Sequence, residues 1–302
     1  MKKILAFILV IVMAFCFTAC GNTQEESVVT IGFAVSTLSD ASFVALVEGA
    51  QTKTEELGIK LIVTNAEGEA TKQASDINDL VTAGVQALIV NPVDCNAIST
   101  AIESAIKSGI KVVVVGNDVK GIGAHCSISS DDILSAKLVT DYLVGKVGKG
   151  ALCVEIQGTI GNPITIDRGE GFHSVADTSL KVVSMESANF NREEATSVME
   201  GMLKAYPGIT CVFAHDDEMA LGAVDAIGEK RIYVVGLGGT DAALAAVQAG
   251  TMLATVAQQP VLMGSTAVEK ASSLIKGESV EDSITIETFL VTADNVTDFI
   301  KW

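Results

Sequence analysis

Short apolar runs rich in Val, Ile and Ala alternate with longer amphipathic segments from Ser27 onward. The first run, Val28–Val35, predicts a buried β-strand, and Phe43, Val47 and Leu57 then follow at helical spacing. Because strands and helices go on alternating along the chain, the pattern predicts βαβ units and a parallel sheet.

The same pattern places the remaining elements in two groups. It predicts further strands at 60–64, 87–90, 112–115, 151–156, 182–187, 211–214, 232–235 and 252–257, with helices that include 73–83, 94–108, 131–147, 193–205 and 218–227. The alternation restarts after the helix at 131–147, and the stretches 84–91 and 208–215 share one order of glycine, strand and polar tip. We therefore expect two similarly built α/β lobes with right-handed crossovers.

The N-terminus has a different pattern. Two lysines precede an unbroken apolar run at 4–17, which has the length of a signal-peptide core and is shorter than a membrane span. Phe-Thr-Ala-Cys then resembles a bacterial lipobox, with Phe17 where Leu is usual. We predict a signal peptide over 1–19, lipidation of Cys20 and a polar tether over 20–27. A transmembrane anchor, or cleavage that leaves Cys20 unmodified, is the alternative.

Composition agrees with an exported α/β protein. Of the 302 residues, 49% are hydrophobic but only 5% aromatic, as in parallel sheets covered by helices. The formal charge of −17 excludes a protein built mainly to hold nucleic acid, and it disfavours anionic membrane surfaces. We therefore expect an extracytoplasmic protein that touches the cell membrane only through its lipid anchor.

The four cysteines after the lipobox are far apart in the sequence, and none forms a Cys-x-x-Cys motif. Cys153 and Cys211 lie in strand-like apolar runs, which favours buried free thiols. A disulfide between Cys95 and Cys126 remains open for an exported chain.

Catalytic motifs are missing from the sequence. The glycine-rich stretch 145–150 lacks the Walker A spacing, and 236–240 lacks the last glycine of a dinucleotide loop. The three histidines are far apart, and no Gly-x-Ser-x-Gly elbow occurs. We therefore predict a non-enzymatic protein without a metal or cofactor.

Polar residues follow most predicted strands, where open parallel sheets bind ligands. Their Ser, Thr, Asn, Asp and Gln side chains suit a small polar solute. In the acidic triplet that opens the helix at 218–227, we expect Asp216 to face the ligand and Asp217 or Glu218 to cap the helix. Helix capping alone is an equally good explanation of the triplet.

Several motifs, in order and from about residue 28 to the C-terminus, together resemble the ribose-type periplasmic sugar-binding proteins, the solute receptors of ABC importers. They are Val-Ser-Thr-Leu at 35–38, Asn-Pro at 91–92, Arg-Gly-Glu-Gly-Phe at 168–172, Asp-Glu-Met-Ala-Leu-Gly-Ala at 217–223, Val-Val-Gly at 234–236, Gly-Thr at 239–240 and Ala-Thr-Val-Ala-Gln-Gln-Pro at 254–260.

The resemblance implies two Rossmann-like lobes joined by a three-crossing hinge that close on the solute. The N-terminal lobe would span 28–130 plus 259–287, and the C-terminal lobe 131–258 plus 288–302. We expect a monomer that delivers a carbohydrate-like solute to the membrane subunits of an ABC permease.

The resemblance also implies solute contacts. Ser36, Phe43, Arg168, Phe190 and Gln258 match family positions that touch the sugar. The two aromatic rings offer flat apolar faces to a sugar ring, and the guanidinium offers a rigid fork of donors. Either ring could instead belong to the core, and Arg168 could form a surface ion pair.

The predicted pocket departs from the family pattern in its charges. Gly116 and Asn117 stand where ribose receptors have an Asp-Arg pair, Gly238 replaces an expected Asp, and Ser42 replaces an aromatic residue, whereas Asp40 and Asp216 replace two Asn residues. Buried carboxylates need donor partners. We therefore predict that the solute is not ribose but a polyol, a modified sugar or an amine-bearing solute, with Asp40, Asn117 and Asp216 among its contacts.

Other functions of the same fold remain open. A nucleoside-binding lipoprotein or a component of a chemosensory receptor is the main alternative. A repressor of the lactose type is disfavoured by the export signal and by the lack of an N-terminal helix-turn-helix.

Overall fold

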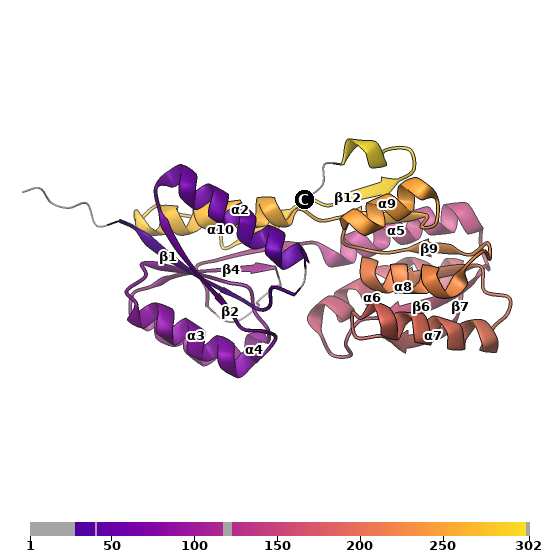
Figure 1. Cartoon of the computed structure of the whole chain (residues 1–302), viewed down its shortest axis with the longest axis horizontal. Helices are drawn as coiled ribbons and strands as arrows, with labels where there is room; N and C mark the ends of the chain where they lie inside the picture. The colour runs from indigo at the N-terminus through magenta and orange to yellow at the C-terminus, as the bar shows by residue number, and fades with distance from the viewer. Residues whose placement is uncertain (1–27, 40, 117–122, 300–302) are drawn as a thin grey trace, which may run out of the picture.

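The computed structural model describes residues 28–39, 41–116 and 123–299, which form two α/β lobes side by side (Figure 1). The sheet of the first lobe has the strand order β11-β5-β4-β3-β1-β2, and all its neighbouring strands are parallel. Its strands are β1 (Thr30–Val35), β2 (Lys60–Asn65), β3 (Ala87–Val90), β4 (Lys111–Gly116), β5 (Cys126–Ser130) and β11 (Ser283–Ile286).

The sheet of the second lobe repeats this design in the order β12-β10-β9-β8-β6-β7, with only the β10–β12 pair antiparallel. Its strands are β6 (Leu152–Gln157), β7 (Lys181–Ser187), β8 (Cys211–Ala214), β9 (Tyr233–Val235), β10 (Ala254–Ala257) and β12 (Phe289–Thr292). The two predicted parallel sheets are thus confirmed.

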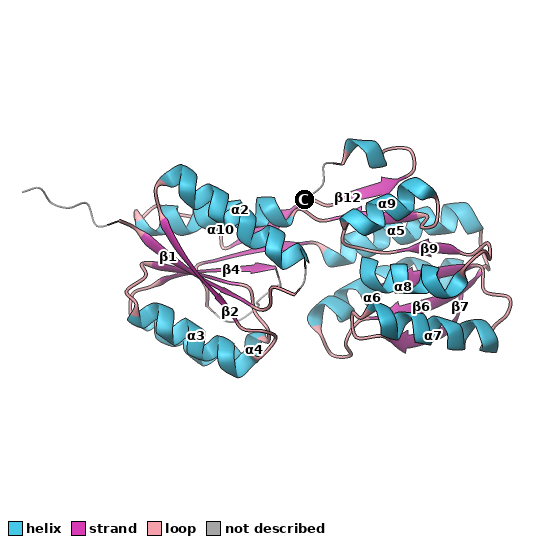
Figure 2. Ribbon diagram, viewed as in Figure 1, coloured by secondary structure: helices cyan, strands magenta, loops and turns pink. Residues whose placement is uncertain are grey.

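Helices cover both faces of each sheet (Figure 2). In the first lobe, α2 (Ala41–Leu57) and α10 (Pro260–Ile275) cover one face, and α3 (Ala70–Thr82) and α4 (Cys95–Lys107) the other. In the second lobe, α5 (Asp132–Val147) and α6 (Pro163–Ser179) lie opposite α7 (Arg192–Ala205), α8 (Asp217–Ile227) and α9 (Asp241–Ala249). A short 3-10 helix, η1 (Val296–Asp298), follows β12.

Within the described ranges the chain passes between the lobes three times. It crosses from β5 to α5, from β10 to α10 and from β11 to β12. The predicted class of two Rossmann-like lobes joined by three crossings is therefore confirmed. Three parallel connections of this kind can act as a hinge.

The crossing from β10 brings α10 into close contact with α2. A Cβ atom on Gly264 would lie 1.9 Å from the carbonyl oxygen of Leu46, and one on Gly49 would lie 2.1 Å from that of Val261. Since no side chain fits between these backbones, the two glycines set how closely the helices pack. This contact fixes the last long helix of the chain to the first lobe.

The predicted strands and helices are present within about three residues of their expected ends, a normal error for element boundaries. β5, β11, β12 and α10 were not among the predicted elements. In β5, buried Cys126, Ile128 and Ser130 alternate with half-buried serines, so this strand lacks the continuous apolar run of its neighbours. The two remaining strands are four residues long and lie at sheet edges.

The thiols of Cys126, Cys153 and Cys211 are buried and free, so the disulfide between Cys95 and Cys126 is not formed. No helix of the described ranges combines the length and apolarity that a membrane crossing needs. The apolar run at 4–17, Cys20 and the tether to residue 27 lie outside the described residues.

Candidate functional site

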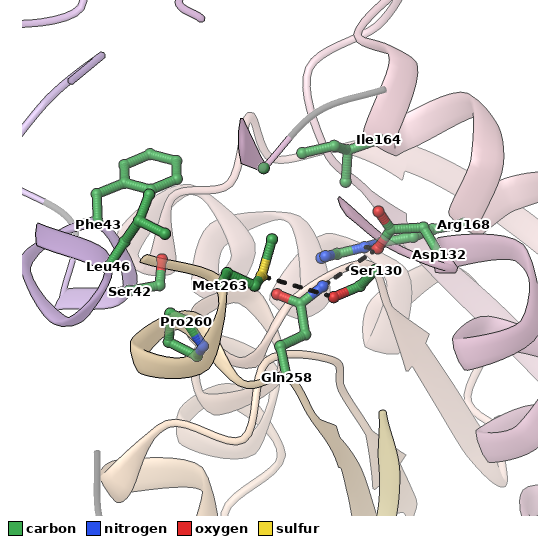
Figure 3. A pocket seen from close by; sticks show the side chains of 11 residues that line it. Ser42, Phe43, Leu46, Ser130, Asp132, Ile164, Arg168, Gln258, Pro260 and Met263 are labelled. Atoms are coloured by element: carbon green, nitrogen blue, oxygen red, sulfur yellow. Dashed lines mark hydrogen bonds and ion pairs between the residues drawn. The ribbon is translucent and has the colours of Figure 1, made fainter. Parts of the chain in front are cut away.

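A pocket lies between the two lobes, near the carboxyl ends of their parallel strands (Figure 3). The end of β4, the end of β5, α2 and α10 line it from the first lobe, and α5 and α6 line it from the second. The lining residues are Ser42, Phe43, Leu46, Gly116, Ser130, Asp132, Ile164, Arg168, Gln258, Pro260 and Met263. Three of the predicted contacts, Phe43, Arg168 and Gln258, therefore meet in one place.

Arg168 on α6 is 6% exposed and is held from two sides. Its Nε donates to Asp132 Oδ1 at 2.7 Å, and its Nη1 donates to the main-chain carbonyl of His215 at 2.5 Å. Because a guanidinium carries five N–H groups in a rigid fork, these bonds fix the direction of the other donors. Arg168 thus forms an ion pair, as the alternative interpretation expected, but the pair is buried in the pocket wall and not on the surface. A solute contact for Arg168 stays a prediction.

Asp132 is a pocket residue that the sequence interpretation missed. It follows Asp131, whose Oδ1 accepts from the backbone N of Leu134 at 2.8 Å and so caps α5. One carboxylate is enough for that cap, which leaves Asp132 for the pocket. The sequence signal for this residue was the pair of consecutive acids that begins a helix directly after the end of a strand.

The Arg168–Asp132 pair depends on close packing of α5 against α6. A Cβ atom on Gly171 would lie 2.2 Å from the carbonyl oxygen of Ile133. The glycine one turn after Arg168 therefore lets α6 lie against the first turn of α5. The Arg-Gly-Glu-Gly segment thus supplies both the guanidinium and the space that brings it to Asp132.

Gln258 joins this polar wall, while Phe43 adds an apolar one (Figure 3). The Nε2 of Gln258 lies 3.5 Å from Asp132 Oδ1, a long contact. Phe43 is half-buried and also packs against the core of the first lobe. The ring therefore lines the pocket and also packs against the core, so the pocket combines donors and acceptors with a flat apolar surface. A solute contact for Phe43 stays a prediction.

Phe190 lies at the same end of the second sheet but outside the pocket lining. Its backbone adopts φ 59°, and a Cβ atom on Gly158 would lie 2.0 Å from its Cζ. The ring therefore sits directly on the Gly158 backbone and packs against the core of the second lobe. A solute contact for Phe190 stays a prediction.

Ser36 is buried at the tip of β1 and ties strand ends together. Its Oγ donates to Asn91 Oδ1 at 2.6 Å, and Asn91 Nδ2 donates to the carbonyl of Val115 at 3.1 Å. This bridge links the ends of β1, β3 and β4. The serine proton is used within the protein, and its predicted solute contact stays a prediction.

The residues of the acidic triplet 216–218 have different roles from those predicted. Asp216 caps α8, since its Oδ1 accepts from the backbone N of Met219 at 2.8 Å. Asp217 is buried and accepts from Thr255 Oγ1 at 2.6 Å and from the backbone N of Thr240 at 2.9 Å. The assignment of the cap to Asp217 or Glu218 was therefore wrong. A solute contact for Asp216 stays a prediction.

Burial dominates the electrostatics of these two carboxyls. It raises the pKa of Asp216 to about 7, against the lowering effects of the Met219 hydrogen bond and of Arg168. Burial also raises the pKa of Asp217, although its hydrogen bonds act in the opposite direction. Asp40 and Asn117, the other predicted contacts that distinguish this pocket, lie outside the described residues.

Comparison with known proteins matches this fold and pocket to one family. Residues 31–279 match the model of a periplasmic binding protein domain. The ribose import binding protein of Bacillus subtilis is 39% identical over 304 residues, which covers 97% of this chain and 99% of that protein. A xylitol-binding protein of Mycolicibacterium smegmatis is 29% identical and covers 92% and 82% of the two chains.

A solved structure shows the same architecture. The solute-binding protein of an ABC transporter from Bacillus halodurans, with bound myo-inositol, superposes with a TM-score of 0.85 at 27% identity, over 91% of this chain and 98% of that one. Family members bind substrates for transport and are not enzymes, so the prediction of a non-enzymatic protein is confirmed. The chain belongs to the periplasmic binding proteins, and within them to the ribose-type sugar-binding group.

Proposed function

We propose that this protein captures a sugar or a sugar-like polyol between its two lobes and delivers it to the permease of an ABC importer. The observation that carries this proposal is the pocket in which Arg168 and Asp132, paired at 2.7 Å, face Phe43 across the cleft between the lobes. Hydroxyl groups can donate to the carboxylate and accept from the guanidinium, while a C–H face lies on the ring.

The relatives support a polyhydroxylated solute. Two relatives are named for ribose and xylitol, and the solved neighbour holds myo-inositol. These molecules share many hydroxyl groups and no charge. A nucleoside as solute and a chemosensory role are therefore not favoured.

The identity of the solute is open to a direct test. Asp40, Asn117 and Asp216 would distinguish the pocket from that of ribose receptors, and we propose that a polyol, a modified sugar or an amine-bearing solute binds more tightly than ribose. The role of Asp216 as a helix cap supports a neutral polyol over an amine, because one of its oxygens is already engaged.

We also propose that the mature protein is a monomer held at the outer face of the cell membrane by lipid on Cys20. The polar segment 20–27 would serve as the tether. The lobes would divide at 28–130 plus 259–287 and at 131–258 plus 288–302.

A thermal-shift panel of ribose, xylitol, myo-inositol, amino sugars and nucleosides tests the proposed function. A ligand at about 100 times its Kd adds about 2.7 kcal/mol of stability, which gives a clear rise in Tm. Arg168→Met should abolish the shift, whereas Arg192→Met, which removes an exposed arginine that pairs with Asp225, should preserve it. Stabilisation by nucleosides alone would overturn the proposal.

A further inference from the structure

Four acid and imidazole groups form a continuous row beneath and along α6, outside the pocket lining. His215 Nε2 lies 2.7 Å from Glu155 Oε1, and both side chains are 0% exposed. His173 Nε2 lies 3.0 Å from Glu155 Oε2, and His173 Nδ1 lies 2.7 Å from Asp177 Oδ1. The row therefore leads from an exposed carboxylate on α6 to a buried imidazole at the end of β8.

The buried end of this row supports the arginine of the pocket. The main-chain carbonyl of His215 accepts from Arg168 Nη1 at 2.5 Å. A Cβ atom on Gly169, the next residue of α6, would lie 3.8 Å from both Glu155 Oε1 and His215 Cε1. The Glu155–His215 pair thus packs directly beneath the turn of α6 that carries Arg168.

The hydrogen bonds indicate how this pair is protonated. His215 Nδ1 is buried and has no hydrogen-bond partner among the described residues. A proton there would create an unpaired buried donor beside Arg168, which is costly. Burial, helped by the charges of Arg168 and His173, lowers the pKa of His215 against the effect of Glu155. The imidazole is therefore neutral and donates from Nε2 to the Glu155 carboxylate.

We propose that Glu155 and His215 are positioning residues for Arg168, and that proton uptake by His215 weakens solute binding. This inference rests on the proposed function, in which Arg168 contacts the solute. A solute that fills the pocket excludes water from Arg168, so repulsion between the guanidinium and an imidazolium at His215 becomes stronger. The solute and the proton therefore compete, and by linkage the affinity falls by up to about tenfold per pH unit in acid.

Other charged groups surround His215, and the tests must distinguish their effects on solute affinity from that of His215. Glu155 faces it from β6, and Arg168 and His173 face it from α6, with Asp177 behind His173. Asp132 is linked to His215 through Arg168, to which both are hydrogen-bonded. Asp216 and Asp217 directly follow His215 in the chain. Burial raises the pKa of Asp216 to about 7, so the effect of Asp216 on binding must be separated from that of His215 by a variant of its own.

The first test needs no solute. The imidazole of His215 is titrated by NMR in the ligand-free mature protein, in the wild type and in Arg168→Gln. We expect its midpoint to rise in the variant, because the neighbouring positive charge is lost. An unchanged midpoint overturns the inference whether or not the solute is a sugar.

The second test measures Kd for ribose, xylitol and myo-inositol by calorimetry from pH 5 to pH 8. His215→Gln keeps an N–H donor for Glu155 but does not titrate, so we expect wild-type affinity at pH 8 and no loss in acid. His215→Leu removes the donor and should weaken binding at every pH. An acid-induced loss that persists in His215→Gln and disappears in Asp216→Asn would overturn the inference.

A matched control is available in the first lobe. His125 is half-buried at the amino end of β5, away from the pocket, so His125→Gln should keep the wild-type pH profile. If the wild type binds none of the three probes, the proposed function fails, and the NMR titration still decides the role of His215. A drop in Tm without any change in the pH profile would show a purely structural role and overturn the proposal.

Discussion

Arg168 and Asp132 form a buried ion pair across two helices, with Nε and Oδ1 2.7 Å apart and side chains 7% and 10% exposed. Lys137 and Asp141 on α5 are equally close, at 2.6 Å, but their side chains are 48% and 53% exposed. Removing one partner of a buried pair strands a charge at a cost of about 3–5 kcal/mol, whereas an exposed pair contributes about 0–1 kcal/mol. Asp132 and Asp141 both lie on α5, so their two ion pairs provide a matched comparison of a buried and an exposed carboxylate.

We predict that Asp132→Ala lowers the free energy of unfolding by about 3 kcal/mol and weakens solute binding at least tenfold, because Arg168 loses its anchor. Asp141→Ala should change the free energy of unfolding by less than about 1 kcal/mol and leave Kd unchanged. Urea unfolding and calorimetry measure both quantities. Equal losses in the two variants would contradict the role assigned to the buried pair.

The contact between α2 and α10 predicts a strong position effect for glycine. Gly264→Ala would place a Cβ atom 1.9 Å from the carbonyl oxygen of Leu46, so the helices must separate. We expect a loss of about 1–3 kcal/mol or more in urea unfolding, as in overpacked cores. Gly145→Ala on α5 is the control, because a Cβ atom at this position would have no neighbour within 4 Å. That variant should be stabilised by up to about 1 kcal/mol. Similar stabilities for both variants would show that the helix contact can relax.

The sequence alone predicted most of the sheet framework, because buried strands such as Ala87–Val90 are continuous apolar runs. It missed β5 because alternate positions of that strand are half-buried serines, and it missed β11 and β12 because short edge strands carry a weak pattern. Local pattern carries no information on which short segment will be paired at a sheet edge.

The site was only partly predictable for a different reason. The family motifs pointed to Arg168, Phe43 and Gln258, which share one pocket. Asp132 was missed and the capping role of Asp216 was misassigned, because consecutive acids at a helix start are alike in sequence and only their packing separates capping from a pocket contact.

The half-buried Asp216 has a raised pKa, which predicts a pH dependence of stability. Burial raises the pKa of Asp216 from 3.8 to about 7 in the folded protein, so its contribution to stability is complete below pH 4 and is lost as the pH rises through 7. Asn caps helices as well as Asp does. Asp216→Asn should therefore gain stability relative to the wild type between pH 5 and pH 8 in urea unfolding. Asp131→Asn, at the exposed cap of α5, is the matched control, and an equal pH-dependent gain in that variant would contradict the role assigned to Asp216.

The proposed lipid attachment at Cys20 predicts that removing this cysteine releases the protein from the membrane. In cells fed a radiolabelled fatty acid, the wild-type protein should carry label and sediment with membranes. Cys20→Ser should be unlabelled and should lose its anchor. Cys95→Ser, a control outside the lipobox, should retain the label. Label that persists in Cys20→Ser would contradict the proposed lipidation.

The pocket wall is built from both lobes, which predicts that the lobes close on the solute. The lining comes from α2 and α10 on one side and from α5 and α6 on the other, so a solute that contacts both sides favours a closed arrangement of the lobes. Since the lobes are joined by three short crossings, closure is expected as a rigid-body hinge motion. We predict that a saturating solute lowers the radius of gyration in solution X-ray scattering of the wild type. Arg168→Met should show no change, because it cannot hold the solute against the second lobe. An unchanged profile for the saturated wild type would mean that the solute binds without closure.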